Sequence, residues 1–228
     1  MTLKVNLMNK SILSSVAVVA IVAVAGGAWF MNRSPAAAQS SGATETTEAA
    51  QFDIVEMIQG NPDAAVRVIE YASYTCPHCA SFHADQYPQL KENYIDTDLI
   101  SFTYREVYFD APGLWASMVA RCGGEMRFFG ISNLLYENQQ NWARGESGEE
   151  IISSLRNIGK VAGLSDAELD VCLTDEAKAQ ELTGWYRSNA DADDVQGTPT
   201  FLINGEKYSN MNYADFAEVL DEKLAESN

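Results

Sequence analysis

The chain has 228 residues, 46% of them hydrophobic, and it carries 15 basic against 32 acidic residues for a net charge of −17. This length fits one domain or one domain with an insertion, and the apolar content suffices for a packed core. Because a chain with this net negative charge is repelled by the phosphate backbones of nucleic acids, we expect no nucleic-acid partner.

Residues 1–33 are expected to form either an export signal or an N-terminal membrane anchor. Lys4 and Lys10 precede an uncharged run over residues 12–31, and Arg33 follows it. A positive start, an apolar stretch and then small residues are typical of an export signal, yet this run is also long enough for one membrane span. Because more positive charge precedes the run than follows it, both interpretations place the body outside the cytoplasm.

Residues 34–51 are rich in Ser, Thr, Ala and Glu and lack large apolar side chains. We therefore expect a disordered linker there, with the folded part starting near Phe52.

The first half of the folded part has the pattern of a βαβ unit. Residues 65–74 are apolar, β-branched and aromatic, which predicts a buried strand, and residues 99–109 predict a second one. Between them, residues 79–94 predict a helix with a kink or break at Pro88. Three positions of this helix are expected to face inward: Phe82, Leu90 and Tyr94.

From residue 111 to about 193 the periodicity is helical. Ser147 with Glu150 and Ser165 with Glu168 match the capping-box pattern at two predicted helix starts. Large apolar side chains of this region are expected in its core: Trp115, Met118, Met126, Phe128 and Phe129.

The C-terminal part returns to strands. Residues 200–204 predict a strand, a turn follows at Asn204 and Gly205, and a short partner strand comes next. The amphipathic stretch over residues 213–226 predicts a closing helix, whose apolar face would hold Phe216, Val219, Leu220 and Leu224. The predicted class is thus α/β, with a βαβ–ββα frame over residues 52–110 and 194–228 interrupted by helices over residues 111–193.

The sequence CPHC at residues 76–79 lies between the predicted buried strand and the predicted helix. Cys76 would then stand at a helix N-terminus, where unpaired N–H groups and the helix dipole favour a thiolate. His78 would stabilise the same charge. A stabilised thiolate favours the reduced form and makes the oxidised pair of Cys76 and Cys79 a strong oxidant.

Other interpretations of this pair remain open but are less favoured. Zinc needs about four ligands, whereas Cys76, Cys79 and His83 supply three and the chain has only two histidines. A c-type haem would require histidine at position 80, which is alanine. A structural disulfide across two residues would constrain the unfolded chain little. We expect no metal, and His83 is interpreted as a helix-surface or packing residue.

Two segments, VIEYASYTCPHC and GTPTFLING, together resemble the DsbA-type thiol:disulfide oxidoreductases of the thioredoxin-fold superfamily. The helical insertion lies where this family has one, so the resemblance extends over residues 52–226. It implies a thioredoxin fold with an inserted helical domain. The dipeptide Pro77-His78 is the DsbA choice, whereas thioredoxins typically have Gly-Pro there.

The resemblance also implies roles for the residues of the motif. Cys76 would be the exposed nucleophile that forms a mixed disulfide with a substrate, and Cys79 would be its more buried partner. Pro77 and His78 would tune the thiolate.

Three further residues gain roles by the same resemblance. Thr198 and Pro199 would form a cis-peptide loop facing the cysteines, where the backbone of Thr198 could pair with an extended substrate strand. Glu70 matches the family's buried acid beneath the cysteines, and it could relay a proton to or from Cys79. The alternative for Glu70 is an edge-strand glutamate that faces water.

Cys122 and Cys172 lie in the predicted insertion. An even cysteine count in an exported protein argues for their pairing, which would stabilise the fold by roughly 4 kcal/mol in the chain-entropy model. A second, structural disulfide occurs in some relatives of this type, and two separate buried thiols are the alternative.

The function implied by the resemblance is that of a periplasmic oxidase. It would introduce disulfides into reduced, unfolded exported proteins, with no cofactor beyond the redox-active disulfide between Cys76 and Cys79. A DsbB-like membrane protein would reoxidise it, and we expect a monomer. The alternatives are an isomerase or reductase on the same fold, and a non-enzymatic holdase or envelope assembly module.

Overall fold

The computed structural model describes residues 52–227, all of which belong to one compact unit. The expected export or anchor segment, with its apolar run over residues 12–31, and the expected linker over residues 34–51 lie outside the described residues. Within the described residues, no helix combines the length and the apolar character needed to cross a membrane.

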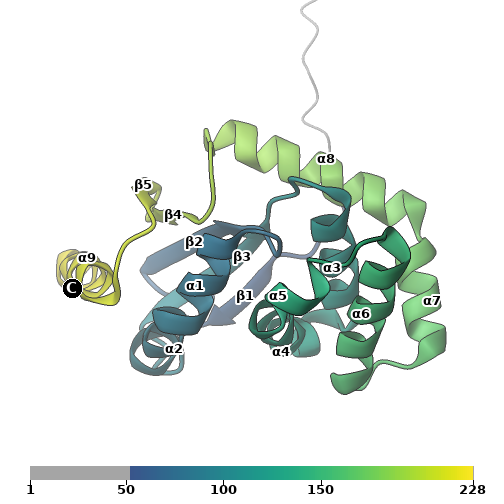
Figure 1. Cartoon of the computed structure of the whole chain (residues 1–228). Coiled ribbons are helices and arrows are strands. Elements are labelled where there is room, and N and C mark those ends of the chain that lie inside the picture. Colours follow the sequence, from purple (N-terminus) through teal and green to yellow (C-terminus); the bar gives the residue numbers. More distant parts are fainter. Residues whose placement is uncertain (1–51, 228) are drawn as a thin grey trace, which may run out of the picture. The chain divides into compact units, whose positions relative to one another are not determined.

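A five-stranded sheet in the order β1-β3-β2-β4-β5 forms the centre of the fold (Figure 1). Its strands are β1 (Met57–Gly60), β2 (Val66–Ala72), β3 (Ile100–Glu106), β4 (Thr200–Ile203) and β5 (Glu206–Ser209). β2 and β3 run parallel, whereas the other neighbouring pairs are antiparallel. The predicted βαβ unit is therefore confirmed.

The edge strand β1 was not predicted from the sequence. It has only four residues and pairs antiparallel with β3. Too few residues alternate for a strand pattern to stand out. Gly60 ends the strand at a φ of 76°, and an added Cβ there would come within 2.3 Å of the carbonyl oxygen of Ile100, so only glycine fits this close approach.

One face of the sheet is covered by helices from both ends of the fold. They are α1 (Pro77–Asp85), α2 (Tyr87–Leu90), the π-helix η1 (Lys91–Ile95) and α9 (Tyr213–Glu226). The predicted break is confirmed: α1 and α2 are separated at Gln86, two residues before Pro88. Most of the residues predicted to face inward from this layer are buried: Phe82, Leu90, Tyr94, Phe216 and Leu220. The other two, Val219 and Leu224, are half-buried.

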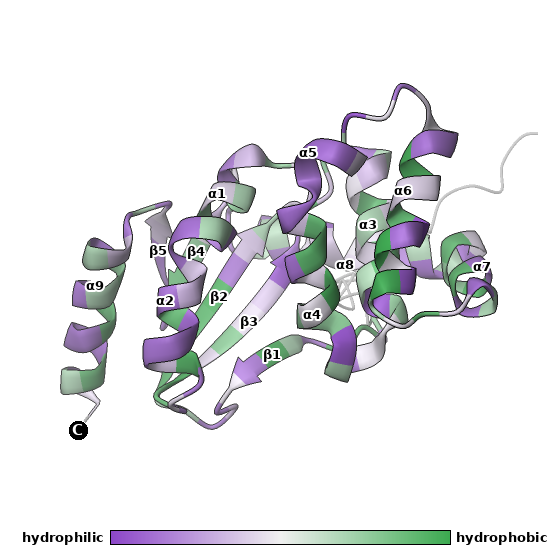
Figure 2. Ribbon diagram, turned by 60° about the horizontal axis from the view of Figure 1, so that its bottom comes forward, coloured by the Kyte–Doolittle hydropathy of each residue, from purple (hydrophilic) through white to green (hydrophobic). Residues whose placement is uncertain are grey.

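Six helices lie between β3 and β4 in the described chain (Figure 1). They are α3 (Ala111–Cys122), α4 (Gly124–Glu137), α5 (Gln139–Trp142), α6 (Gly148–Val161), α7 (Asp166–Thr174) and α8 (Glu176–Ala192). α8 reaches the second face of the sheet, where Tyr186 packs near Ile69 and Tyr71 of β2. Hydrophobic and hydrophilic residues alternate in bands along α6 and α9 in Figure 2, as expected for helices with one buried side.

Of the two predicted capping boxes, one is complete. At the start of α7, Ser165 Oγ accepts from the backbone N–H of Glu168, and the Glu168 carboxylate accepts from the backbone N–H of Ser165. At the start of α6, Ser147 Oγ accepts from the N–H of Glu150, but the Glu150 carboxylate turns to the N–H of Glu146. The predicted box at the start of α6 is thus an ordinary N-cap, because the N–H of Glu146 in the preceding loop binds the Glu150 carboxylate instead.

The predicted core of the insertion is confirmed except at one position. Met118 and Phe128 are buried, and Trp115 and Phe129 are half-buried against the cluster that contains Phe128. The prediction for Met126 is wrong, because this residue is 99% exposed. It lies in the first turn of α4 on the side opposite Phe128, so the turn of the helix points it away from the core.

Candidate active site at the start of α1

The local sequence places Cys76 at the N-cap of α1. β2 ends at Ala72, a short loop follows, and Cys76 has extended backbone angles (φ −81°, ψ 120°) before the helix begins at Pro77. Proline suits the first helical position, because its fixed φ is helical and the N–H it lacks would be unpaired there anyway. No side chain caps this helix start, so its free N–H groups point toward the region of the Cys76 thiol.

The insertion fixes the loop that carries Cys76. Nε2 of Gln139, at the start of α5, donates to the carbonyl oxygens of Tyr74 at 2.8 Å and of Cys76 at 2.9 Å. The hydroxyls of Tyr74 and Ser132 of α4 lie 2.7 Å apart. Sequence reasoning missed Gln139, since a single glutamine in a helical stretch has no pattern that marks it as buried.

The structure favours a thiolate at Cys76. The hydrogen bond from the Cys79 thiol is the largest influence and lowers the pKa of Cys76 to about 5, against the opposing effect of burial. Backbone N–H groups of His78 and Cys79 add to the lowering. The His78 side chain itself is exposed, so stabilisation of the thiolate by its imidazole stays a prediction.

The partner thiol has the opposite character. Cys79 is completely buried, and that burial raises its pKa far above the ordinary value; its hydrogen bond to Cys76 and the charge of Glu70 act in the same direction. Cys76 is less exposed than expected for a nucleophile, at 8%, yet it is the more accessible of the two. Both thiols are free in this structure. One sulfur is therefore a nucleophile and leaving group, and the other holds its proton.

The loop at residues 198–199 faces the cysteines. The Thr198–Pro199 peptide bond is cis, and the carbonyl oxygen of Thr198 lies 3.5 Å from Sγ of Cys76. A shallow pocket of about 460 Å³ adjoins this loop and is lined partly by Asp194 and Lys207. An extended peptide laid along the loop would bring its own sulfur within reach of Cys76.

Glu70 is completely buried in the middle of the sheet, where it pairs with Tyr104 of β3 and Phe201 of β4. The edge-strand alternative is therefore wrong, because β2 is a central strand. Both carboxylate oxygens contact Nε2 of His83, at 3.1 and 3.0 Å.

Of the two interpretations of His83, a helix-surface or a packing residue, the first is wrong and the second is confirmed. Only 4% of its side chain is exposed, and its ring stacks on Tyr136 with centroids 4.2 Å apart. The helical turn places His83 on the same side of α1 as Cys79, facing the sheet. Sequence reasoning missed the pair that it forms with Glu70, because the two residues belong to different elements. The described residues hold no group of three or more His, Cys, Asp or Glu side chains arranged for a metal ion.

The other two cysteines form a disulfide in the insertion. Sγ of Cys122, the last residue of α3, is bonded to Sγ of Cys172 in α7, across a separation of 50 residues. The alternative of two separate thiols is thus excluded.

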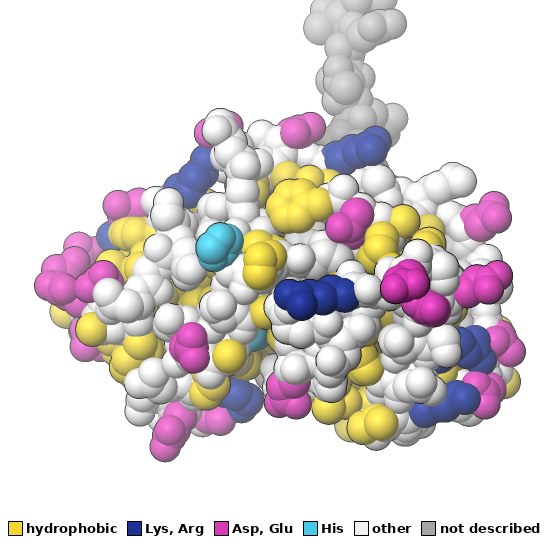
Figure 3. Space-filling view, viewed as in Figure 1, with side chains coloured by type: hydrophobic (Ala, Val, Ile, Leu, Met, Phe, Trp, Pro, Cys, Tyr) yellow, Lys and Arg dark blue, Asp and Glu magenta, His cyan; other side chains and the backbone are white. Residues whose placement is uncertain are grey.

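The surface beside the redox pair includes exposed apolar side chains. Figure 3 shows hydrophobic side chains on the face around α1 and α3, interspersed with polar and charged ones. Phe109, in the loop before α3, is 58% exposed, and its neighbour Asp110 accepts a hydrogen bond from the hydroxyl of Thr75 in the active-site loop. Unfolded chains expose apolar side chains, so this face suits such a ligand.

Comparisons with known proteins agree with this geometry. The profile of a thioredoxin family matches residues 53–222. A Rickettsia bellii protein named as a protein-disulfide oxidoreductase is 32% identical over 178 residues, which cover 78% of this chain and 68% of that protein. The disulfide bond formation protein D of Bacillus subtilis is 23% identical, covering 73% and 76%. The crystal structure of Wolbachia pipientis alpha-DsbA1 shares the fold, with a TM-score of 0.70 and 24% identity over 75% of this chain and 92% of that one.

Proposed function

This chain belongs to the DsbA-type protein-disulfide oxidoreductases of the thioredoxin superfamily, and from that premise we propose that it introduces disulfide bonds into exported proteins outside the cytoplasm. The observation that carries the proposal is the contrast between the two thiols of residues 76–79. The lowered pKa of Cys76 and the raised pKa of Cys79 are the arrangement that a dithiol oxidant needs.

The reaction starts from the oxidised pair. A substrate thiolate attacks Sγ of Cys76, the bond between Cys76 and Cys79 breaks, and its electron pair leaves on Sγ of Cys79, which then takes up a proton. A second substrate thiolate attacks the substrate sulfur of this mixed disulfide. Cys76 leaves as a thiolate, which its low pKa makes a good leaving group. The substrate has lost two electrons and two protons. This chain has gained the two electrons as a Cys76 thiolate and a Cys79 thiol, and the second proton goes to solvent.

The substrates of this proposal are reduced, unfolded polypeptides. The exposed apolar side chains around α1 and α3 would contact them without sequence preference (Figure 3). The cis loop at Thr198 and Pro199 would hold an extended segment with its sulfur near Cys76. No cofactor is needed, because the disulfide itself accepts the two electrons.

The location follows from the N-terminal segment of the sequence. Residues 12–31 would either be removed after export or hold the protein at the inner membrane, in both cases with its body in the periplasm. A DsbB-like membrane protein would reoxidise the dithiol. Fractionation of cells that express the full chain checks this, and a cytoplasmic fraction carrying all of the protein would contradict it.

The function is tested by oxidation of reduced, unfolded ribonuclease, with glutathione disulfide as the terminal oxidant. The full chain is compared with Cys76→Ser and with the matched variant Cys122→Ser/Cys172→Ser. We expect Cys76→Ser to lose at least about a hundredfold in rate, since the nucleophile is gone. The matched variant should stay within about twofold, because the disulfide of the insertion takes no part in the exchange.

The same assay separates the alternatives. A holdase would protect ribonuclease from aggregation equally well as Cys76→Ser. An isomerase would act faster on scrambled, fully oxidised ribonuclease than on the reduced form. A reductase would reveal itself in a redox titration against glutathione, because its dithiol would be a much stronger reductant than that of an oxidase.

A further inference from the structure

The released sulfur of Cys79 needs a proton that it cannot take from bulk water directly. Cys79 has no exposed surface, and its pKa is raised, so it ends each exchange protonated. Glu70 lies close enough for its charge to act on Cys79, but Glu70 is also completely buried. A proton route to Cys79 therefore has to continue beyond Glu70.

Within the described residues, His83 is the hydrogen-bond partner of the Glu70 carboxylate. Its Nε2 lies 3.1 and 3.0 Å from the two oxygens. The other ring nitrogen, Nδ1, is buried and has no hydrogen-bond partner within the described residues. A buried ring nitrogen without a hydrogen-bond partner destabilises the fold, so such an atom points to a catalytic role or to a bound water molecule.

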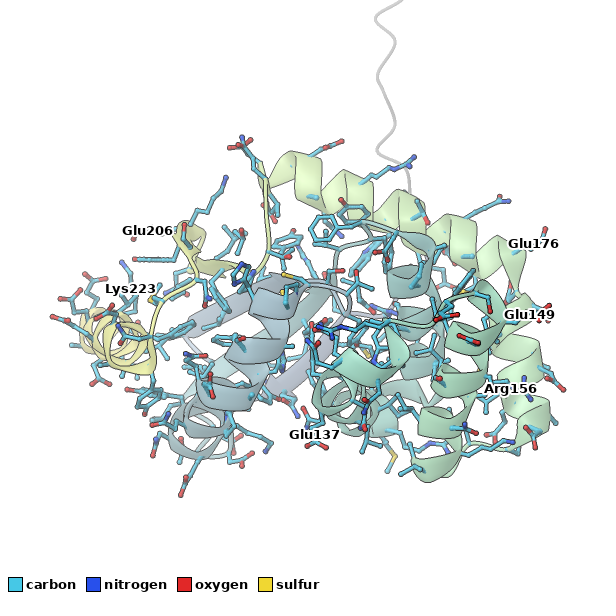
Figure 4. The ribbon with its side chains drawn as sticks, viewed as in Figure 1. Glu137, Glu149, Arg156, Glu176, Glu206 and Lys223 are labelled. Atoms are coloured by element: carbon cyan, nitrogen blue, oxygen red, sulfur yellow. A yellow bond between two sulfur atoms is a disulfide. The ribbon has the colours of Figure 1, made fainter. Side chains whose placement is uncertain are left out.

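His83 also lines a pocket beside α1, together with Ala80 and Ala84 of the same helix. The pocket has a volume of about 190 Å³ and opens between α1, α2 and α4. Its polar lining comes from His83, Tyr87, Lys91, Asn133, Tyr136 and Glu137. Glu137, at the end of α4, is labelled in Figure 4. The pocket is large enough for several water molecules and offers them polar partners.

We propose that His83 relays protons between this pocket and Cys79 through Glu70, so that the buried sulfur exchanges protons with the solvent in the pocket. This inference rests on the proposed function, and it adds a second, substrate-free route to the site.

The steps balance as follows. When the Cys76–Cys79 bond breaks, the Glu70 carboxylate takes a proton from Nε2 of His83 and passes it to Sγ of Cys79, directly or through one water. Nδ1 of His83 takes a replacement proton from the solvent in the pocket. His83 has then changed tautomer. Reoxidation of the dithiol runs the same steps backwards and restores the first tautomer.

Other titratable groups surround the ring and set the conditions for this exchange. Tyr87 of α2 and Tyr136 of α4 lie on it, with ring centroids 4.7 and 4.2 Å away, and Tyr104 of β3 lies at 6.0 Å. Burial raises the pKa of all three hydroxyls, so they stay neutral over the working range. Lys91 and Glu137 line the pocket with opposite charges.

The test measures cleavage of the Cys76–Cys79 disulfide in the oxidised full chain by excess dithiothreitol, from pH 5 to pH 8. His83→Gln keeps the approximate size and the polarity of the side chain, but an amide cannot take up a proton at one atom and release one from another as the imidazole ring does. We expect cleavage by this variant to be slower by about tenfold or more, at the low end of general acid–base effects. Alkylation of Cys76 in the reduced variant should stay within about twofold, because that reaction does not involve the proton of Cys79.

A second variant makes the test independent of a general structural fault. His83→Ala joins the space of the lost ring to the pocket, so added imidazole should restore the cleavage rate in proportion to its concentration. Asn133→Ala is the matched control: it enlarges the same pocket without removing a titratable group, and it should cleave at the full rate with no response to imidazole.

The outcomes separate this inference from the function. Unchanged cleavage by His83→Gln overturns the relay. Slow cleavage by His83→Ala that imidazole fails to restore overturns it as well. If His83→Ala does not fold, the pH profile of His83→Gln decides alone, and a slowing that is uniform from pH 5 to pH 8 overturns the relay. The oxidase proposal falls only if Cys76→Ser still oxidises ribonuclease.

Discussion

Cys76 and Cys79 stand at the beginning of a helix, whereas Cys122 is the last residue of one. The first position meets free N–H groups and the positive end of the helix dipole, and the second meets the negative end. The first pair closes a loop of two intervening residues, and the second joins residues 50 apart. A short loop at a helix start makes a disulfide that is easily opened, and a long loop makes one that stabilises the fold.

The largest contrast is expected in the titration of the two thiols. Alkylation of Cys76 with iodoacetamide, followed by mass spectrometry in the reduced full chain, should have its midpoint near pH 5. Cys122, freed in a Cys172→Ala variant, should titrate at or above the ordinary value of about 8.5, because it ends its helix.

The contribution of Cys79 to this contrast can be measured directly. Its thiol makes the hydrogen bond with the largest effect on the pKa of Cys76. Cys79→Ala should therefore move the midpoint of Cys76 upward by about one unit or more, and Cys79→Ser should move it less, since a hydroxyl still donates. Equal midpoints in all three proteins would leave the helix start as the sole cause.

Removal of the disulfide in the insertion is expected to lower the stability strongly and the activity little. Cys122→Ala/Cys172→Ala should reduce the free energy of unfolding by about 4 kcal/mol, the chain-entropy value for a loop of this length. Urea unfolding measures this change. A loss of oxidase activity in the folded variant would mean that the second pair takes part in the exchange, and the contrast would fail.

The low pKa of Cys76 makes the stability of the reduced protein depend on pH. A thiol whose pKa is lower in the folded state than in the unfolded state binds fewer protons when folded. The reduced protein should therefore gain stability, relative to the oxidised one, as the pH rises from about 5 to about 8.5, and should lose this gain below pH 5. The gain should amount to a few kcal/mol. Unfolding of both forms across this range measures it, and a constant difference would contradict the titration.

Above the ordinary thiol pKa the sign reverses, because Cys79 keeps its proton in the folded protein while the unfolded chain loses it. The relative stability of the reduced form should thus level off and then fall above about pH 9.

A smaller effect is expected from the glutamine that fixes the active-site loop. Gln139→Leu removes both hydrogen bonds to the carbonyls of Tyr74 and Cys76, which leaves buried acceptors unpaired. We expect a loss of about 1 to 3 kcal/mol in the free energy of unfolding and a raised alkylation midpoint for Cys76. The neighbouring Gln140 is exposed, so Gln140→Leu is a matched control that should change neither quantity.

The sequence predicted the parts of the site that local patterns encode. The strand before Cys76, the helix after it and its break before Pro88 follow from periodicity and from the properties of proline. The resemblance to DsbA-type proteins added the cis bond at Pro199.

The parts that the sequence left out depend on tertiary contacts. Gln139 lies 63 residues from Cys76, and His83 lies 13 residues from Glu70 on a different element. Neither residue type marks a buried position, because glutamine and histidine occur on surfaces as often as in sites. Which side chain meets which depends on how the insertion and α1 pack on the sheet, and no local pattern records that.

The smallest effect concerns two methionines that flank Cys122 at four residues on each side. Met118 is 5% exposed and packs in the insertion, whereas Met126 is 99% exposed. Met126→Ala should change the free energy of unfolding by less than about 0.5 kcal/mol, since no contact is lost. Met118→Ala, the matched control, should cost about 2 to 4 kcal/mol through a lost core contact and a cavity. Urea unfolding of both variants tests whether the chain around Cys122 is packed at Met118 but not at Met126. Comparable losses in the free energy of unfolding would mean that Met126 makes a packing contact.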